Sequence, residues 1–210
     1  MVKTSQKDMG NRPGTGLQRK GRERIEKILD AATELLIQEG HSQFTMRKLA
    51  ERLNIRLSNL QYYFTSREKL LQKLLQRFLE TSIQEITSLS TKQSRSPRKK
   101  LLDAVDYLLQ DQEKESSCKI FWELWVLSAR DNKVGQIMEE FYQSYSKSFG
   151  EMLQELNPEM PPRKVTRIAV LVISMIEGLS LMRGFGKQRH AHIQGIEKEL
   201  RDAILRLIEA

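Results

Sequence analysis

Apolar side chains recur every three or four positions through most of the chain, with polar residues between them. This spacing places apolar residues on one face of an α-helix. From Arg22 onward the pattern predicts a helix that ends at Gly40, because glycine readily takes the left-handed conformation that closes helices. No segment alternates apolar and polar residues convincingly, as a half-buried strand would. The pattern therefore predicts an all-α protein of about nine helices.

The segment 41–64 predicts two short helices joined by a tight turn. Thr45 can cap the first of them through its hydroxyl oxygen. Asn54 stands at the turn, where asparagine tolerates a positive φ. Ala50 is small where the two helices must approach closely. The arrangement is typical of a helix-turn-helix, although any helical hairpin gives a similar pattern.

The rest of the chain is also helical in pattern. Thr65 and Glu68 form a predicted capping box at the start of a long helix that runs to Ile86. The polar and basic stretch 87–100 predicts a junction between two helical layers. The five apolar-periodic segments beyond it span about 97–112, 117–129, 132–156, 162–187 and 190–208.

Composition narrows the class of protein. The 210 residues include 11 glycines and 5 prolines, too few for a turn-rich β-protein. The single cysteine, Cys118, excludes an intrachain disulfide and a cysteine-based zinc site. The polar N-terminus predicts no secretory signal. The longest apolar run, 168–176, is far shorter than the roughly 20 residues that span a membrane, so we expect a soluble, cytoplasmic protein with no membrane partner.

The net charge of +8 is unevenly placed. Residues 1–72 hold 14 Lys and Arg against 8 Asp and Glu, a net of +6, whereas residues 73–210 have a net of +2. This positive field favours a polyanionic partner such as nucleic acid. The alternative is a solubilising basic tail.

Residues 24–71 resemble the N-terminal domain of the tetracycline-repressor (TetR) family of bacterial transcriptional regulators. The resemblance rests on apolar and small residues and on a Tyr-Phe-x-Ser-x-Glu motif, all at the family's spacing. The matching residues are Ile28, Ala31, Ala32, Leu35, Leu36, Glu39, Gly40, Phe44, Thr45, Met46, Leu49, Ala50, Ile55, Leu60, Tyr63, Phe64, Ser66, Glu68, Leu70 and Leu71.

The resemblance implies a division of labour along the chain. Residues 1–21 would form a disordered basic arm, residues 22–72 a helix-turn-helix DNA-binding domain, and residues 73–210 a helical ligand-binding and dimerisation domain. The second helix of the motif would lie in the major groove, and a homodimer would read a palindromic operator in double-stranded DNA. The implied function is a transcriptional regulator, a repressor released by an unknown small-molecule effector, with no enzymatic activity and no cofactor.

The recognition helix is predicted over about 57–62, where this chain departs from the family's Val-Ser-x-Gly-Thr-Leu-Tyr pattern. Asn59 and Gln61 can bond adenine or phosphate, and Arg56 phosphate or guanine, although Gln61 could also be a solvated helix residue. Leu57 contacts a thymine methyl or packs internally. The resemblance makes Arg67 a phosphate anchor. The DNA-binding candidates are Thr45, Arg47, Arg56, Leu57, Ser58, Asn59, Gln61, Tyr62, Tyr63 and Arg67.

The basic arm has two interpretations. Its residues Arg19, Lys20 and Arg22 either follow the minor groove or the phosphates, or belong to a solvated tail.

Aromatic residues at helical spacing in 97–210 predict either an effector cavity or ordinary core. Glu177 lies in the most apolar helix, where an unpaired carboxylate is costly to bury. It would face a polar or cationic effector, or pair with Arg183 or a group of a partner subunit. The ligand-binding candidates are Tyr107, Phe121, Trp122, Trp125, Phe141, Tyr145 and Glu177.

The last predicted helix carries an apolar stripe that the resemblance assigns to a four-helix dimer interface. The alternative is that the stripe packs only within its own subunit. The dimer candidates are Ile193, Ile196, Leu200, Ile204 and Leu207.

Other chemistries find little support in the sequence. His190 and His192 are two positions apart without an acidic cluster, so we expect no metal site, and we expect Cys118 to be buried and inert. The motifs of nucleotide-binding, zinc-protease and serine-hydrolase sites are absent, which disfavours a helical enzyme. A helical adaptor that uses the short helices for protein contacts is the remaining alternative.

Overall fold

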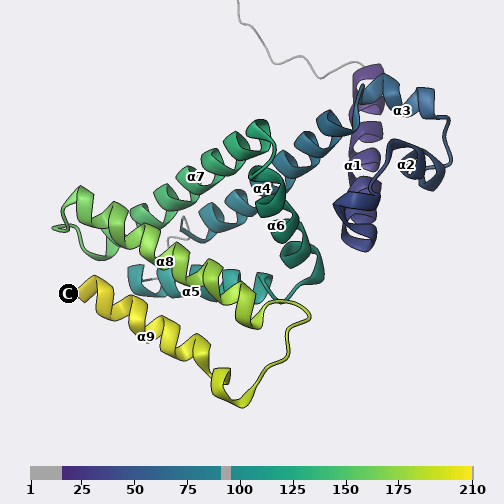
Figure 1. Ribbon diagram of the computed structural model, residues 1–210. Coiled ribbons are helices and arrows are strands. Elements are labelled where there is room, and N and C mark those ends of the chain that lie inside the picture. The colour runs from purple at the N-terminus through teal and green to yellow at the C-terminus, as the bar shows by residue number, and fades with distance from the viewer. Residues whose placement is uncertain (1–15, 91–95, 210) are drawn as a thin grey trace, which may run out of the picture.

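The computed structural model describes residues 16–90 and 96–209, and within these residues it contains nine α-helices and one short 3-10 helix (Figure 1). The all-α prediction is confirmed. The helices are α1 (Gly16–Gln43), α2 (Met46–Arg52), α3 (Leu57–Tyr63), α4 (Arg67–Ser90), α5 (Pro97–Asp111), α6 (Glu115–Ser128), α7 (Asn132–Leu156), α8 (Pro162–Arg183), the 3-10 helix η1 (Ala191–Ile193) and α9 (Ile196–Glu209).

Helices α1 to α3 form the small domain at one end of the molecule (Figure 1). The Thr45 side chain caps α2 by accepting a hydrogen bond from the Lys48 backbone N–H at 3.2 Å. Asn54 has a φ of 50° in the turn, and the Ile55 N–H donates to the Ala50 carbonyl at 3.0 Å. The predicted helix-turn-helix is therefore present, with its cap and turn at the expected residues.

Two helix starts differ from the predictions. Helix α1 begins at Gly16, so residues 16–21 of the predicted disordered arm are helical, while residues 1–15 lie outside the described residues. Helix α4 is capped by Ser66, whose hydroxyl accepts from the Lys69 N–H at 3.3 Å, and not by Thr65. Both residues can cap a helix. The choice depends on where the chain leaves α3, which periodicity does not determine.

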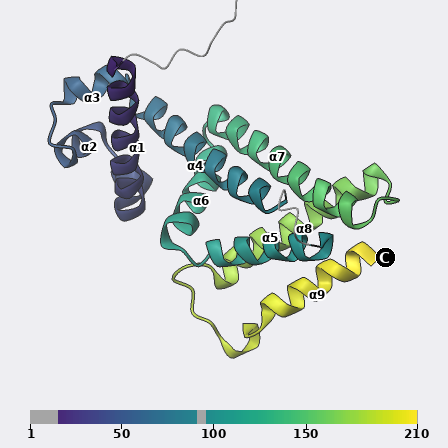
Figure 2. The same ribbon diagram turned by 180° about the vertical axis from the view of Figure 1, so that it is seen from behind.

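Helix α7 is the central element of the larger domain, because it packs against α4, α5, α6 and α8. The views from front and back show α8 and α9 at the end of the molecule opposite α1 to α3 (Figures 1 and 2). The predicted helices 162–187 and 190–208 are shorter than expected. Helix α8 ends at Arg183, and a connection with positive φ at Gly186 and Gly195 precedes α9.

Helix α8 is apolar on more than one side. Val172 and Ile176 are buried in the bundle, whereas Leu181 and Met182 are 51% and 62% exposed. By length and composition alone, α8 could cross a membrane, with 39% of its most apolar stretch buried within the described residues. A core helix that is also apolar on a second face passes the same test.

Candidate functional site

Helix α3 presents a polar face to solvent. Leu60 is fully buried and holds α3 against the rest of the small domain. Arg56, Ser58 and Asn59 at the start of α3 are exposed, as is Gln61. A helix held on its apolar side with exposed amide and guanidinium groups on the other has the form of a recognition helix.

The neighbouring candidates lie around this face. Thr45 and Arg47 are exposed at the start of α2. Tyr62 is 83% exposed, and its ring meets the half-buried Tyr63 ring edge-on at 5.1 Å. Leu57 is half-buried against the core, which favours its packing role over a base contact.

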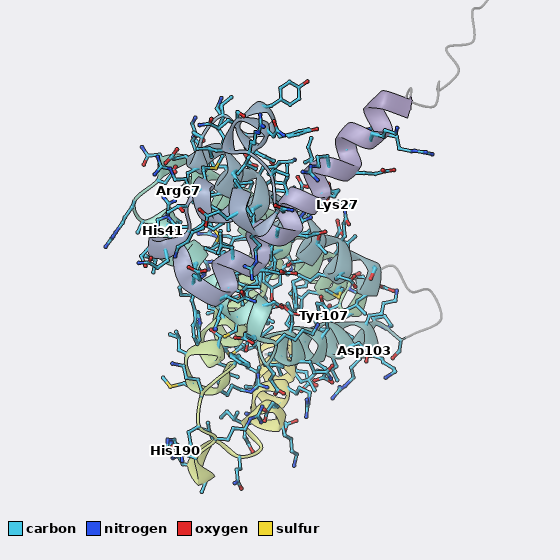
Figure 3. All side chains as sticks on the ribbon, turned by 90° about the vertical axis from the view of Figure 1, so that its right-hand side faces the viewer. Lys27, His41, Arg67, Asp103, Tyr107 and His190 are labelled. Carbon is cyan, nitrogen blue, oxygen red and sulfur yellow. The ribbon has the colours of Figure 1, made fainter. Side chains whose placement is uncertain are left out.

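Arg67 is held by backbone groups of its own domain. Its Nε donates to the Phe44 carbonyl at 2.7 Å, and its Nη2 donates to the His41 carbonyl at 2.6 Å. Figure 3 shows Arg67 and His41 side by side at this junction. The guanidinium therefore ties the start of α4 to the last turn of α1 and to Phe44, which lies between α1 and α2. The resemblance implied a phosphate anchor, and sequence reasoning missed this structural role.

The second candidate site is a small cavity of about 30 Å³ in the larger domain. Six of the seven predicted ligand-binding residues line it. The exception is Trp125, which is 40% exposed and donates from Nε1 to the Tyr142 hydroxyl at 3.1 Å. The lining residues in the prediction are Tyr107, Phe121, Trp122, Phe141, Tyr145 and Glu177; those that it missed are Ser82, Ile86, Leu108, Asp111, Gln112, Ser117, Cys118 and Ser180.

Glu177 is the charged group of special interest in this cavity. Burial raises the pKa of its carboxyl from 4.5 to about 7. The carboxylate has no ion-pair partner within the part of the chain that the structure describes. The alternative of a Glu177–Arg183 pair is wrong, because Arg183 bonds Glu113, Glu197 and the Leu109 carbonyl instead.

Two buried donors in the same cavity also lack a hydrogen-bond partner among the described residues: Trp122 Nε1 and the Tyr145 hydroxyl. Buried polar groups are almost always paired, so orphaned groups point to a missing water or ligand. Burial, with the nearby Glu177 charge, raises the pKa of the Tyr145 hydroxyl, which keeps it neutral and able to donate. The cavity therefore combines a carboxylate, unpaired donors and aromatic rings.

Cys118 lines the cavity as a buried thiol. Burial raises its pKa, which lowers the thiolate fraction and makes it a poor nucleophile. This matches the expectation of an inert cysteine. His190 and His192 lie in the connection before α9, where their rings stack at 5.5 Å. No group of three or more metal-binding side chains occurs within the described ranges.

Helices α4 and α6 connect the cavity to the small domain. Ser82 and Ile86 of α4 line the cavity, and the same helix begins at Arg67. Lys119 of α6 donates from Nζ to the Ile37 carbonyl of α1 at 3.3 Å. A change in the cavity can therefore reach the small domain through two helices.

The apolar stripe predicted to form the dimer interface packs largely against helices of its own subunit. Leu200 and Ile204 are buried, because α9 packs against α5 and α8. Ile193, Ile196 and Leu207 are half-buried. The alternative of packing within the subunit holds for Leu200 and Ile204. In the larger domain, the large exposed apolar side chains lie instead on α8 and α6, namely Val170, Leu171, Leu181, Met182, Trp125 and Val126.

Comparisons with known proteins agree with this architecture. Residues 28–74 match the model of bacterial regulatory proteins of the tetR family, and residues 97–209 match the C-terminal domain of BetI-type transcriptional repressors. An uncharacterised HTH-type transcriptional regulator in the dhlA 5′ region of Xanthobacter autotrophicus is 32% identical over 162 residues, covering 75% of this chain and 78% of that protein.

Solved structures share the fold at low sequence identity. A TetR-family transcriptional regulator from Mesorhizobium loti has a TM-score of 0.74 at 14% identity, covering 90% of this chain and 97% of that one. A transcriptional regulator from Saccharomonospora viridis, solved in complex with choline, has a TM-score of 0.68 at 16% identity, covering 90% and 96%. The chain thus belongs to the TetR family of transcriptional regulators, a family without enzymatic activity, and pairs its helix-turn-helix domain with a BetI-type C-terminal domain.

Proposed function

We propose that this regulator is a repressor that binds a palindromic operator as a homodimer and is released by a small organic cation. The observation that carries the effector class is the half-buried Glu177 carboxylate, which has no cationic partner within the described residues and lines a cavity together with aromatic rings. The proposed regulator acts in the cytoplasm, where the operator DNA lies.

The α3 face supports the DNA side of the proposal. Asn59 and Gln61 read base edges or bond phosphates, and Arg56 bonds a phosphate or a guanine. Thr45 and Arg47 contact the backbone from α2. These side chains are all exposed, so they can reach a duplex without any rearrangement of the domain.

The cavity chemistry supports a cationic effector. An organic cation is attracted by the carboxylate of Glu177 and by the faces of aromatic rings such as Phe121 and Trp122. The Lys187 Nζ lies 4.9 Å from the centre of the Trp122 ring, so this ring already contacts a cation of its own chain. Choline, the ligand in the Saccharomonospora viridis complex, is a quaternary ammonium ion and therefore a suitable first probe.

The small size of the cavity explains how an effector would release the repressor from DNA. A volume of about 30 Å³ holds about one water molecule, so a quaternary ammonium ion must part the surrounding helices. The moving helices include α4 and α6, which reach the small domain through Arg67 and Lys119. Two recognition helices must lie about 34 Å apart to fit successive major grooves, so a small displacement weakens binding. The effector must bind the open state better, or no release occurs.

The exposed apolar side of α8 supports the homodimer. Leu171, Leu181 and Met182 are large apolar side chains on one helix, and a second copy of α8 is the surface that covers them. Together with α9, this forms a four-helix interface. The proposed interface thus moves from the stripe on α9 to the outer side of α8.

A mobility-shift titration tests the proposal. The probe is the DNA upstream of the protein's own gene, with scrambled DNA as competitor, in the presence and absence of choline or tetramethylammonium. We expect selective binding that either cation weakens, and loss of the cation response in Glu177→Gln. Glu151→Gln, on the exposed side of α7, is the matched control. Equal binding to both DNAs would contradict the regulator, and an unchanged cation response in Glu177→Gln would contradict the effector site.

A further inference from the structure

A groove on the outside of the larger domain lies between α6, α7 and α8. Its volume is about 600 Å³, which is in the range of pockets that hold small molecules. Each helix lines this outer groove with one face, because the lining residues recur at helical spacing. They are Trp125 and Ser128 of α6, Met138, Tyr142 and Ser146 of α7, and Val170, Ile173, Ser174, Glu177 and Gly178 of α8.

Glu177 connects the outer groove to the small cavity, because it lines both. Among the described residues that line the outer groove, Glu177 alone is charged. The small cavity holds about one water molecule, whereas the outer groove has room for an organic ion. The groove is open to solvent at Trp125 and Val170, which are 40% and 49% exposed. A cation can therefore approach the half-buried Glu177 carboxylate through the outer groove.

Two aromatic side chains line the outer groove together with Glu177. The Trp125 Nε1 donates a hydrogen bond to the Tyr142 hydroxyl at 3.1 Å, which fixes the two rings relative to each other. Burial and the nearby Glu177 charge raise the pKa of the Tyr142 hydroxyl, so it stays neutral. Aromatic rings and a carboxylate together attract quaternary ammonium groups. Trp125 does not line the small cavity, but it lines the approach to Glu177.

The rest of the outer groove offers an apolar wall. Met138, Val170 and Ile173 contribute to this wall. From Met138 to Ser146 the wall extends for about 12 Å along α7. An apolar chain attached to the cation would lie along this wall, and burying its methylene groups would add to the affinity.

The proposed dimer surface leaves the outer groove open. Leu171, Leu181 and Met182 form that surface, and none of the three lines the groove. A second copy packed into the groove about a two-fold axis would also bring the unpaired Glu177 carboxylates of both subunits into one interface. Charge complementarity therefore favours a cationic ligand over a second copy as the occupant of the outer groove.

We propose that the effector is an amphipathic cation, whose positive group binds Glu177 beside Trp125 and Tyr142 while its apolar part lies in the outer groove. This inference rests on the proposed function and deepens it, because it names the part of the effector that the small cavity cannot hold. A small polar cation such as choline leaves the apolar wall uncovered, so it should bind more weakly than a cation with an alkyl chain.

The test compares tetramethylammonium with hexyltrimethylammonium by isothermal titration calorimetry at pH 8, where Glu177 is ionised. The two cations carry the same charge and differ by five methylene groups. A half-buried methylene gains about twofold in affinity, so the longer cation should bind about 30-fold tighter. Glu177→Gln should weaken the binding of both cations.

Two variants separate the groove from the carboxylate. A Cβ added at Gly178 meets no atom within 4 Å, so Gly178→Leu fills part of the groove without displacing the backbone. It should remove most of the gain from the longer chain, whereas Gly21→Leu, at another open helical glycine, should keep it. Val170→Gln makes the wall polar and should reduce the gain, with the 56% exposed Val126 replaced by Gln as its control.

The outcomes distinguish the inference from the proposed function. Glu177-dependent binding with equal affinities for the two cations overturns the groove assignment alone, as does a chain-length gain that persists in both groove variants. Absence of binding by either cation, or binding that Glu177→Gln leaves unchanged, overturns the proposed effector site and this inference with it. A wild type without the gain, together with monomeric Gly178→Leu in analytical ultracentrifugation, would show that a second copy covers the groove.

Discussion

The raised pKa of Glu177 predicts how the free energy of unfolding changes with pH. Burial raises its pKa from 4.5 to about 7, a difference that corresponds to about 3 kcal/mol. Below pH 4.5 the carboxyl is protonated in both the folded and the unfolded state, and it has no effect on the pH dependence. Between pH 4.5 and 7 the unfolded chain has lost a proton that the folded protein keeps, so stability falls as the pH rises. Above pH 7 both states are ionised and the loss is complete.

The variant Glu177→Gln cannot ionise at this position, so it does not lose stability between pH 4.5 and 7 as the wild type does. Its free energy of unfolding should exceed that of the wild type by an amount that grows by about 2 kcal/mol between pH 5 and pH 8. Urea titrations at the two pH values measure the difference, with Glu151→Gln as the control. Other titrating groups, such as His41, are present in both proteins, so their contributions cancel in the difference between the two free energies of unfolding. A stability difference that is the same at both pH values would refute the assignment of a half-buried, uncompensated carboxylate.

The same ionisation sets the pH dependence of effector binding. A cation binds the ionised form of Glu177, of which about a tenth is present at pH 6 and most at pH 8. Choline affinity should therefore increase about tenfold over this interval in the wild type and stay constant in Glu177→Gln. Isothermal titration calorimetry measures this change. Equal affinities at pH 6 and pH 8 in the wild type would show that the ligand does not contact the carboxylate.

Three further predictions concern other parts of the molecule. Asn59→Ala should reduce discrimination between operator variants by about 1–3 kcal/mol at one base pair, measured by anisotropy; unaltered discrimination would remove Asn59 from the base contacts. Arg67→Ala should lower the free energy of unfolding by about 2–3 kcal/mol in urea, because it removes the side-chain donor of the Phe44 carbonyl and one of the two donors of the His41 carbonyl, and Arg67→Lys should restore little of it. Leu181→Glu should yield monomers in analytical ultracentrifugation, and a persistent dimer would place the interface elsewhere.

Local patterns identified the DNA-reading domain well. Thr45 caps α2, Asn54 takes the positive φ in the turn, and Leu60 is buried, because each of these properties depends on neighbours within a few positions. The helical start of α1 at Gly16 was missed, since that segment has no apolar stripe from which to recognise a helix.

Features that depend on distant packing were less predictable. Periodicity shows that Leu200 and Trp125 each lie on an apolar face, but it does not show which helix covers that face. Leu200 proved to be buried within its own subunit, and Trp125 does not line the cavity. The contributions of Ser82 and Ile86 to the cavity could not be read from the sequence, because they arise from α4 packing beside α7.

The buried Arg183 has a consequence for how this protein can diverge. It holds the end of α5, the turn before α6 and the start of α9 through the Leu109 carbonyl and the Glu113 and Glu197 carboxylates. This anchoring leaves aromatic cavity-lining side chains such as Tyr107 and Phe121 out of the ionic framework. Substitutions among those side chains alter what the cavity accepts while the helix ends stay fixed. Under the proposed function, a lineage can therefore exchange one effector for another through a few point mutations, without having to evolve its scaffold anew.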